Sequence, residues 1–528
     1  MAPRVLISDK MSETAVTIFK ARGIEVDYEP DLGKDKEALL RRIGDYDGLA
    51  VRSATKATAK IIDAANKLKV IGRAGIGVDN IDIAAASAKG IIVMNAPMGN
   101  AVTTAEHAIA MMLALARNIP QANASTRAGK WEKSRFMGVE VYRKTLGLIG
   151  CGNIGSIVAE RAQGLSMKVI AYDPYLTEER AAEIGVEKVE LDELLARADF
   201  ISLHTPLTDQ TRGILDAAAM KKMKPGARIV NCARGGLVVE KDLHDALTSG
   251  HLAGAALDVF EEEPATDNPL FGLDNVICTP HLGASTTEAQ ENVAVQIAEQ
   301  MSDYLLSGAV SNALNMPSIS AEEAPKLKPF IALAEKLGLF IGQIVDSAIK
   351  DVTIEYGGHV GDMNTRALTS AALAGLLRPL LGEVNMVSAP VVAKERGLAI
   401  NEVRQTPRGV YEGYIRLEVT TESSKRTVAG TVFSDGKPRI IQAKGINMEA
   451  EFGDHMLYVV NKDQPGFLGD IGTLLGEADV NIASMSLGRT GPGGEAVALI
   501  EVDEPPGDAV LQKVRALPQV HWASALAF

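Results

Sequence analysis

The sequence contains only three cysteines in 528 residues, namely Cys151, Cys232 and Cys278. None of them has the spacing of a zinc site, so we expect no metal site, and three thiols cannot build a disulfide framework. All three lie in an apolar mid-chain region, which predicts small buried thiols. Free thiols are typical of reducing compartments, and the sequence therefore predicts a cytoplasmic protein.

Positive net charge and long apolar runs are also missing. The formal net charge of −13 at pH 7 argues against a general nucleic-acid or anionic-membrane surface. No stretch approaches the ~18 uncharged apolar residues of a membrane span, and the N-terminal segment turns polar too soon for a signal peptide. We therefore expect no nucleic-acid or membrane partner. The net charge still leaves room for a local basic pocket that binds a small acidic substrate.

The chain is long and has the composition of globular domains. Its 528 residues, 46% hydrophobic and 23% charged, predict three or four domains. Over residues 1–98, short apolar runs such as "RVLISD" and "DGLAVRS" alternate with helical patterns such as "SETAVTIFKARG". This alternation predicts a parallel, doubly wound sheet.

A long helical pattern follows in "TTAEHAIAMMLALARNIPQANAS", with Thr103 or Thr104 as the expected N-cap. A second series of strands and helices spans residues 145–281 and predicts a second doubly wound sheet. The amphipathic helix in "STTEAQENVAVQIAEQMSDYLLSG" then carries the chain back. We therefore expect residues 1–98 and 287–316 to form one discontinuous domain and residues 99–286 to form another.

The last third of the chain differs in its pattern. "NALNMPSIS" predicts a linker, and residues 317–452 mix helices with alternating strands, which predicts an α+β domain. Residues 453–528 follow the order β-α-β-β-α-β of a ferredoxin-like domain. The predicted fold class is α/β, with two doubly wound parallel-sheet domains of the Rossmann or flavodoxin type, then an α+β domain and a ferredoxin-like domain.

A glycine-rich segment, "TLGLIGCGNIGSIVAERA", joins a predicted strand to a predicted helix. Gly150, Gly152 and Gly155 fit the G-x-G-x-x-G pattern of dinucleotide-binding domains. The first glycine allows a tight turn, the second lets the backbone approach a pyrophosphate, and the third permits close packing of helix on strand.

The neighbouring residues complete this predicted cofactor site. The N–H groups of Asn153 and Ile154 open the helix and would bind the pyrophosphate. Asp173 ends the following strand, "KVIAYD". Its carboxylate would accept hydrogen bonds from both ribose hydroxyls and repel a 2′-phosphate, which predicts NAD rather than NADP.

Three polar residues end predicted strands of the second series: Arg234 in "IVNCARGG", Glu263 in "DVFEEEP" and His281 in "ICTPHLGAST". Ligands bind at these strand ends in doubly wound sheets. Each residue alone also has a structural explanation, as a turn cap, a solvated acid or a packed histidine.

In order and spacing, these segments and "HTPLTDQTRGIL" resemble the D-isomer-specific 2-hydroxyacid dehydrogenase family. The resemblance implies that His281 is the general acid/base, that Glu263 is its partner, and that Arg234 binds the substrate carboxylate and polarises the keto group. These residue types suit the chemistry, because His titrates near neutrality and Arg pairs with carboxylates in a planar, two-pronged geometry. The resemblance also implies that further residues line the NAD site: Ile76, Thr205, Cys232, Ala233, Asp258, Gly283 and Ala284.

Two arginines end neighbouring strands of the first series, Arg52 beside Ser53 in "AVRSATK" and Arg73 in "IGRAGIGVDNID", while Asn100 precedes a helix. The arginines predict a pocket for a second anion such as phosphate, although each alone fits a surface ion pair. These segments resemble the family members that oxidise 3-phosphoglycerate, and the resemblance covers nearly the whole chain. It implies that all four residues face the phosphate or carboxylate of the substrate.

The same resemblance concerns assembly and regulation. Trp131 and Lys133, in "GKWEKSRFMGVE", are implied to contact the neighbouring subunit's site, although Trp131 fits a core position at a helix end equally well. The last residues resemble an ACT domain, with the turn D-x-P-G in "NKDQPGFLGD". Asn461, Asp463 and Asn481 are then implied to hold an amino-acid effector, L-serine, although an ACT fold used only for assembly is the alternative.

Residues 317–452 resemble the intervening domain of the long members of the family. Lys437, Arg439 and Lys444 would form an anion site there, but a solvated strand face is the more ordinary explanation.

The resemblance implies NAD-dependent oxidation of 3-phospho-D-glycerate to 3-phosphohydroxypyruvate, the first step of phosphorylated L-serine biosynthesis. It further implies feedback by L-serine in a homo-oligomer, expected to be a tetramer. One alternative is a glyoxylate or hydroxypyruvate reductase, whose substrate has no phosphate. Another is an NAD-sensing, co-repressor-like binding protein.

Overall fold

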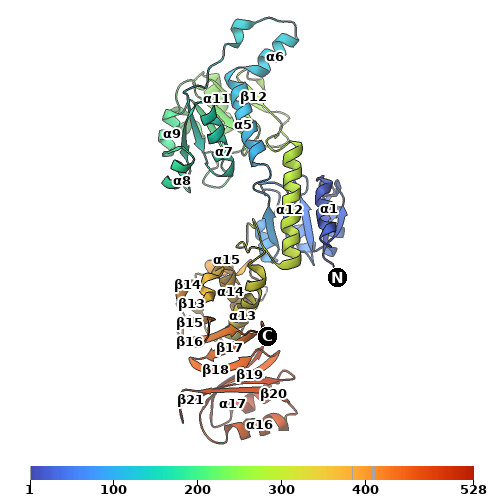
Figure 1. Ribbon diagram of the computed structural model, residues 1–528, viewed down its shortest axis with the longest axis vertical. Coiled ribbons are helices and arrows are strands. Elements are labelled where there is room, and N and C mark those ends of the chain that lie inside the picture. The colour runs from blue at the N-terminus through green and yellow to red at the C-terminus, as the bar shows by residue number, and fades with distance from the viewer. Residues whose placement is uncertain (1, 383, 406–410) are drawn as a thin grey trace.

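The structure is a computed structural model that describes residues 2–382, 384–405 and 411–528. Figure 1 shows an elongated molecule in which a lobe at each end flanks two lobes in the middle. The chain enters the end lobe drawn in green through α5 and returns along α12, and the C-terminal segments stack below in orange and red. This confirms the predicted fold class, because two parallel sheets are followed by a mixed sheet and an antiparallel one.

The first lobe contains a five-stranded parallel sheet in the order β2-β1-β3-β4-β5, the flavodoxin order. Its inner strands are buried along their length except at Arg4 and Arg73, as expected for a parallel sheet covered on both faces. The strands are β1 (Arg4–Ile7), β2 (Glu25–Tyr28), β3 (Gly48–Val51), β4 (Val70–Arg73) and β5 (Ile92–Asn95). The helices are α1 (Glu13–Ala21), α2 (Lys36–Arg42), α3 (Ala59–Ala64) and α4 (Ile83–Ala88).

The second lobe contains a seven-stranded parallel sheet in the order β12-β11-β10-β9-β6-β7-β8. One of these strands, β8, has only two residues and is too short to show a pattern in the sequence. The strands are β6 (Thr145–Ile149), β7 (Lys168–Tyr172), β8 (Glu187–Lys188), β9 (Phe200–Leu203), β10 (Arg228–Asn231), β11 (Gly254–Leu257) and β12 (Val276–Cys278). The helices are α7 (Asn153–Gly164), α8 (Glu178–Glu183), α9 (Leu191–Arg197), α10 (Ala217–Lys222) and α11 (Glu240–Thr248).

The first crossover between these lobes differs from the prediction of one long helix. It is split into α5 (Ala101–Ala116) and α6 (Ile119–Arg127), because Asn118 adopts a left-handed conformation with φ 52° and Pro120 follows. The predicted N-cap at Thr103 or Thr104 is also wrong, since the helix already begins after Asn100. The helix therefore starts one turn closer to the first sheet.

The second crossover is α12 (Thr287–Ser307), which agrees with the predicted helix. Its N-cap Thr286 accepts from the Ala289 N–H group, and Gly308 ends it in the left-handed conformation. The helix packs on the first sheet so closely that a Cβ atom on Gly72 would lie 2.3 Å from the Met301 sulfur. The predicted linker then follows the edge of that sheet, where Leu314 donates to the Val93 carbonyl.

The third lobe combines a six-stranded mixed sheet, β14-β13-β15-β16-β17-β18, with two long helices. These helices touch through glycines, since a Cβ atom on Gly375 would lie 2.0 Å from the Glu335 carbonyl oxygen. The helices are α13 (Ala324–Gly342), α14 (Thr365–Leu381) and α15 (Ala389–Glu395). The strands are β13 (Ile349–Gly358), β14 (Ala399–Gln405), β15 (Gly413–Thr421), β16 (Lys425–Val432), β17 (Pro438–Ala443) and β18 (Ile446–Glu451).

The C-terminal lobe has the predicted ferredoxin-like order, with a four-stranded antiparallel sheet β20-β21-β19-β22. Its elements are β19 (His455–Lys462), α16 (Phe467–Glu477), β20 (Ile482–Arg489), β21 (Glu495–Val502), α17 (Asp508–Arg515) and β22 (Val520–Ala527). One sheet face packs on its own helices. The other face, including Tyr458, packs against Phe340 of α13, so the third and fourth lobes share a core.

Short 3-10 helices cover Leu32–Lys34, Ile43–Asp45, Lys133–Phe136, Pro269–Gly272 and His359–Asp362. Within residues 2–382, 384–405 and 411–528, no helix combines the length and apolar character that crossing a membrane requires. The prediction of three buried thiols is wrong for Cys278, which is exposed because it ends the edge strand β12.

Candidate active site

The glycine-rich turn between β6 and α7 has the geometry of a dinucleotide cradle. Gly150 has φ 93°, and a Cβ atom there would lie 2.6 Å from the His204 carbonyl oxygen. A Cβ atom on Gly155 would lie 2.3 Å from the Gly150 carbonyl oxygen. At Gly152, by contrast, a Cβ atom would meet nothing within 4 Å. The protein's own packing therefore requires two of the glycines, and the third keeps a space open that an external group would fill.

The adjoining elements supply an anion site and an acid. Gly152 holds the N-cap position of α7 and offers no side-chain acceptor, so the N–H groups of the first turn, at Asn153 and Ile154, remain for a ligand. Asp173 follows β7, where its carboxylate accepts from the N–H groups of Cys151 and Tyr175, both at 2.8 Å. These bonds hold the acid beside the glycine turn, as the NAD prediction requires.

The remaining predicted cofactor residues gather at the same edge of the sheet. They follow the carboxyl ends of four adjacent strands: Thr205 after β9, Cys232 and Ala233 after β10, Asp258 after β11, and Gly283 with Ala284 after β12. Ile76 comes from the first lobe, in the loop after β4, and its carbonyl oxygen accepts from Asn95. The sites predicted from the sequence thus lie on facing edges of the two lobes.

His281 and Glu263 meet as predicted. The Nδ1 atom of His281 lies 2.7 Å from a Glu263 oxygen, and the other oxygen accepts from the Phe260 N–H group at 3.1 Å. The hydrogen bond that His281 donates to the Glu263 carboxylate raises the pKa of His281 and outweighs the opposing effect of burial. Burial works to raise the pKa of Glu263, but the His281 and Phe260 hydrogen bonds together lower it. With Nδ1 held, the Nε2 atom of a half-exposed imidazole is left to exchange a proton with a substrate.

Three guanidinium groups, of Arg234, Arg73 and Arg52, lie close enough for the charges of the other two to act on Arg73. Arg234 reaches from the second lobe to Asp79 of the first, with Nε 3.1 Å from the carboxylate. Arg73 is largely buried behind it, and its pKa falls to about 10 because of burial and the charges of Arg234 and Arg52. Arg52 is fixed by its backbone N–H group, which donates to Asp9 at 2.6 Å. This concentration of positive charge favours an anion.

Two buried polar atoms of the predicted substrate residues have no hydrogen-bond partner among the residues that the structure describes. They are Nε of Arg73 and Oδ1 of Asn100, whose side chain does not cap α5. Ser53 is exposed beside Arg52. Buried polar atoms are normally satisfied, so two unsatisfied atoms among the predicted substrate residues fit a site that is completed by a polar ligand.

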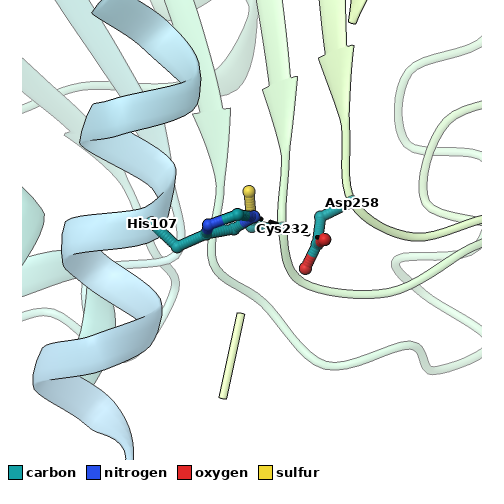
Figure 2. Close-up of side chains that lie close together, drawn as sticks. All are labelled: His107, Cys232 and Asp258. Atoms are coloured by element: carbon teal, nitrogen blue, oxygen red, sulfur yellow. Dashed lines mark ion pairs between the residues drawn. The ribbon is translucent and has the colours of Figure 1, made fainter. Parts of the chain in front are cut away.

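A histidine absent from the predictions contacts Asp258 and Thr279, the latter two residues before His281. His107, on α5, has its Nε2 atom 3.3 Å from Asp258 Oδ1, and the Cys232 thiol lies beside both, as Figure 2 shows. The sequence signal was a polar residue on the apolar face of a helix, three residues after Thr104 and four before Met111.

His107, Cys232 and Asp258 have ligand atoms within 4.8 Å of one another, close enough to hold a metal ion. However, burial raises the pKa of the Cys232 thiol, which disfavours the thiolate that a metal binds. The Asp258 carboxylate already accepts from Thr279, Leu282 and Gly283. The cluster is therefore better described as a hydrogen-bond network.

In the C-terminal lobe, the three predicted effector residues are not equally free. Asn461 is buried and its Oδ1 atom has no hydrogen-bond partner within the described part of the chain, whereas Asp463 pairs with Arg489 at 2.8 Å. Asn481 donates to Asp503 at 2.8 Å. Asn461 thus carries the unmet hydrogen-bonding capacity of this set.

The weaker candidate in the third lobe gains no support as an anion site. Arg439 pairs with Asp435 and Glu451, and Lys444 pairs with Glu495, so acids already compensate two of its three cations.

The segment from α6 to the 3-10 helix Lys133–Phe136 forms an exposed arm. Helix α6 buries none of its residues, and Trp131, between the two helices, is 87% exposed. This arm projects from the second lobe (Figure 1).

Comparisons with known proteins agree with this geometry. Residues 109–283 match the family model of the D-isomer specific 2-hydroxyacid dehydrogenase NAD-binding domain, residues 326–444 that of the D-3-phosphoglycerate dehydrogenase intervening domain, and residues 455–519 that of the ACT domain.

Two relatives are similar over nearly the whole chain. A D-3-phosphoglycerate dehydrogenase of Synechocystis sp. is 43% identical, covering 97% of this chain and 92% of its own. One of Archaeoglobus fulgidus is 44% identical, covering 97% and 98%. A solved glyoxylate reductase from Paecilomyes thermophila is 30% identical with a TM-score of 0.55, and covers 59% of this chain and 98% of its own. The chain therefore belongs to the D-3-phosphoglycerate dehydrogenases, within the D-isomer specific 2-hydroxyacid dehydrogenase family.

Proposed function

We propose that this protein oxidises 3-phospho-D-glycerate to 3-phosphohydroxypyruvate with NAD, the first step of phosphorylated L-serine biosynthesis. The observation that carries the proposal is the cluster of Arg52, Arg73 and Arg234 opposite the His281–Glu263 pair. The substrate has a carboxylate next to the reacting carbon and a phosphate two bonds further on. A site with three guanidinium groups matches two anions at once.

The proposed chemistry assigns one task to each residue. Neutral His281 accepts the proton of the substrate hydroxyl at Nε2, while Glu263 fixes Nδ1–H and stabilises the imidazolium that forms. Arg234 binds the carboxylate and polarises the oxygen that becomes the keto group. NAD, when bound, supplies the hydride acceptor. The NAD would be held by the glycine turn and the helix start, that is, by Gly150, Gly152, Gly155, Asn153 and Ile154. The open space at Gly152 supports this assignment.

The other predicted site residues keep their assignments as part of this proposal. Asp173 selects NAD through its carboxylate, and Arg52, Ser53, Arg73 and Asn100 bind the substrate anions. The proposed domains are residues 1–98 with 287–316 for substrate, 99–286 for NAD, 317–452 as the intervening domain and 453–528 as the ACT domain, and the four separate sheets support this division.

A glyoxylate or hydroxypyruvate reductase is the less favoured function. Such a substrate carries no phosphate, so the buried charge of Arg73 would face no second anion. A co-repressor-like role is also less favoured, because the His281–Glu263 pair is assembled and accessible. The long relatives that share the tail are dehydrogenases by name.

We further propose that L-serine binds the ACT domain and inhibits the enzyme. The unpartnered Oδ1 atom of Asn461 supports a polar ligand there. Asp463 would give up part of its pairing with Arg489 to an ammonium group, and Asn481 would complete the site. We also propose a homotetramer in the cytoplasm, with Trp131 and Lys133 of the exposed arm reaching the neighbouring subunit.

The test is an NADH-formation assay with 3-phosphoglycerate, coupled to a phosphoserine aminotransferase that removes the product. Glyoxylate and hydroxypyruvate reduction are measured in parallel. The expected result is a kcat/KM for 3-phosphoglycerate that exceeds those for the unphosphorylated substrates. His281→Ala should lower kcat by orders of magnitude while NADH binding persists. No NADH formation from 3-phosphoglycerate by the intact chain would refute the proposal.

A further inference from the structure

We propose that His107 is a positioning residue for the reaction: from the crossover helix α5, it holds the turn that carries His281. This inference rests on the proposed function, since the turn matters only if His281 transfers the proton. His107 is absent from the residues assigned to the cofactor, the substrate or the catalytic pair. Its polar partners are Thr279, which leads into the turn, and Asp258, the acid beneath the turn.

The turn has a shape that needs support. His281 has φ 55°, a left-handed conformation that residues other than glycine seldom adopt. Its own N–H group donates to the Asp258 carbonyl oxygen at 2.9 Å. The next two N–H groups, of Leu282 and Gly283, donate to the Asp258 carboxylate at 2.7 and 2.8 Å. The turn is therefore wrapped around one fully buried carboxylate.

Helix α5 reaches the same carboxylate from the opposite side. His107 Nε2 lies 3.3 Å from Asp258 Oδ1 and 3.3 Å from Thr279 Oγ1, and the Thr279 hydroxyl donates to Oδ1 at 2.5 Å. Figure 2 shows the imidazole pointing from the helix toward the acid. His107 is thus the side-chain donor that joins the crossover helix to the two residues fixing the turn.

The neighbours of His107 on the helix strengthen this contact. A Cβ atom on Gly283 would lie 3.4 Å from Thr104 Cγ2, and the Thr279 hydroxyl lies 3.9 Å from the Met111 sulfur. Positions 104, 107 and 111 share one helix face. The same face therefore meets the turn over two helical turns, and His107 is its hydrogen-bonding member.

A physical reason links this contact to rate. Burial works against the ionised form of Asp258, but hydrogen bonds from His107, Thr279, Leu282 and Gly283 together lower its pKa. Loss of the His107 donor would leave one lone pair of a buried anion unmet and loosen the turn. His281 would then lie less well aligned with the substrate hydroxyl, and a misplacement of about 1 Å lowers a rate by up to ~100-fold.

The experiment compares three variants with the parent chain. His107→Leu removes the donor, and His107→Gln restores an N–H donor at a similar reach. Glu106→Gln changes the exposed neighbour on the same helix and serves as the matched control. Each protein is measured for kcat and KM with 3-phosphoglycerate, for NADH Kd by fluorescence titration, for the pH profile of kcat/KM, and for Tm.

We expect His107→Leu to lower kcat by roughly tenfold or more, and His107→Gln to recover most of that loss. The NADH Kd and the acid limb of the pH profile should stay as in the parent, because Glu263 still sets the protonation of His281. A purely structural role would lower Tm without changing the kcat of the folded fraction.

Several results would overturn the inference. The inference fails if the parent is active and the His107→Leu variant has the same kcat as the parent. It also fails if the His107→Gln variant is as slow as the Leu variant. A His107→Gln variant whose lower rate is explained entirely by a weaker NADH Kd would overturn the inference as well. If the Leu variant fails to fold, the Gln variant decides alone, since the inference then requires it to keep most of the parent kcat. A parent chain without activity would refute the proposed function itself.

Discussion

The glycine turn offers a test in which folding and cofactor binding respond to different substitutions. Gly152→Ala and Gly155→Ala add the same methyl group three residues apart. At Gly155 the new Cβ atom would lie 2.3 Å from the Gly150 carbonyl oxygen, well inside van der Waals contact. At Gly152 it would meet no protein atom within 4 Å, and the backbone there is extended (φ −75°, ψ −150°), which alanine tolerates.

The expected magnitudes follow from these distances. Relieving the contact at Gly155 requires a backbone shift of about 1 Å, and overpacking of this kind costs about 1–3 kcal/mol. In a domain of this size, that predicts a Tm lower by about 2–12 °C. Gly152→Ala restricts only the unfolded chain and should stabilise by about 0.4–1 kcal/mol. The same methyl group would stand where the pyrophosphate approaches, so NADH affinity should fall about tenfold or more.

Thermal unfolding followed by circular dichroism, together with NADH fluorescence titration, measures both effects. We expect Gly152→Ala to keep or raise the Tm of the parent and to lose NADH binding. Gly155→Ala should lose stability first, and its binding defect should follow from that loss. A Gly152→Ala variant that binds NADH as tightly as the parent would refute the cradle, and one that unfolds like Gly155→Ala would refute the packing argument.

Three further predictions concern the charges of the site and the tail. Glu263→Gln should move the acid limb of the kcat/KM profile for oxidation to lower pH. The carboxylate raises the pKa of His281, and oxidation needs neutral His281, so activity rises with pH through that pKa. An acid limb that stays in place in the pH–rate profile would contradict the pairing. Arg73→Gln should raise the KM for 3-phosphoglycerate by about 10- to 150-fold, the equivalent of one charged hydrogen bond. The Tm should not fall, because the substitution removes a buried cation that other cations repel. An unchanged KM would show that Arg73 does not belong to the substrate site. Asn461→Ala should keep the basal rate and abolish inhibition by L-serine in a titration of the initial rate, and full inhibition of this variant would place the effector elsewhere.

Local patterns were sufficient to predict most of the secondary structure. The inner strands of both parallel sheets are apolar runs that end in turn residues, and such runs need no tertiary information to be seen. The failures were also local in origin. The strand β8 is too short to carry a pattern, and one left-handed residue, Asn118, split a helix whose apolar periodicity continued through it.

The sequence by itself determined which chemical groups stand at the ends of the strands. Glycine spacing, an acid after the next strand, and Arg234, Glu263 and His281 at strand ends were all legible, because strand ends are set by short-range backbone and apolar patterns.

Only the tertiary structure decided which of these groups meet. Arg234 and Asp79 are separated by 155 positions and pair across two lobes. Burial lowers the pKa of Arg73 first, and the charges of Arg234 and Arg52, which packing brings near it, lower that pKa further. His107 looked like one more residue of an apolar helix until α5 was placed against Asp258. Such contacts depend on how the two crossover helices place one sheet against the other. The separation of two residues along the chain does not reveal that arrangement.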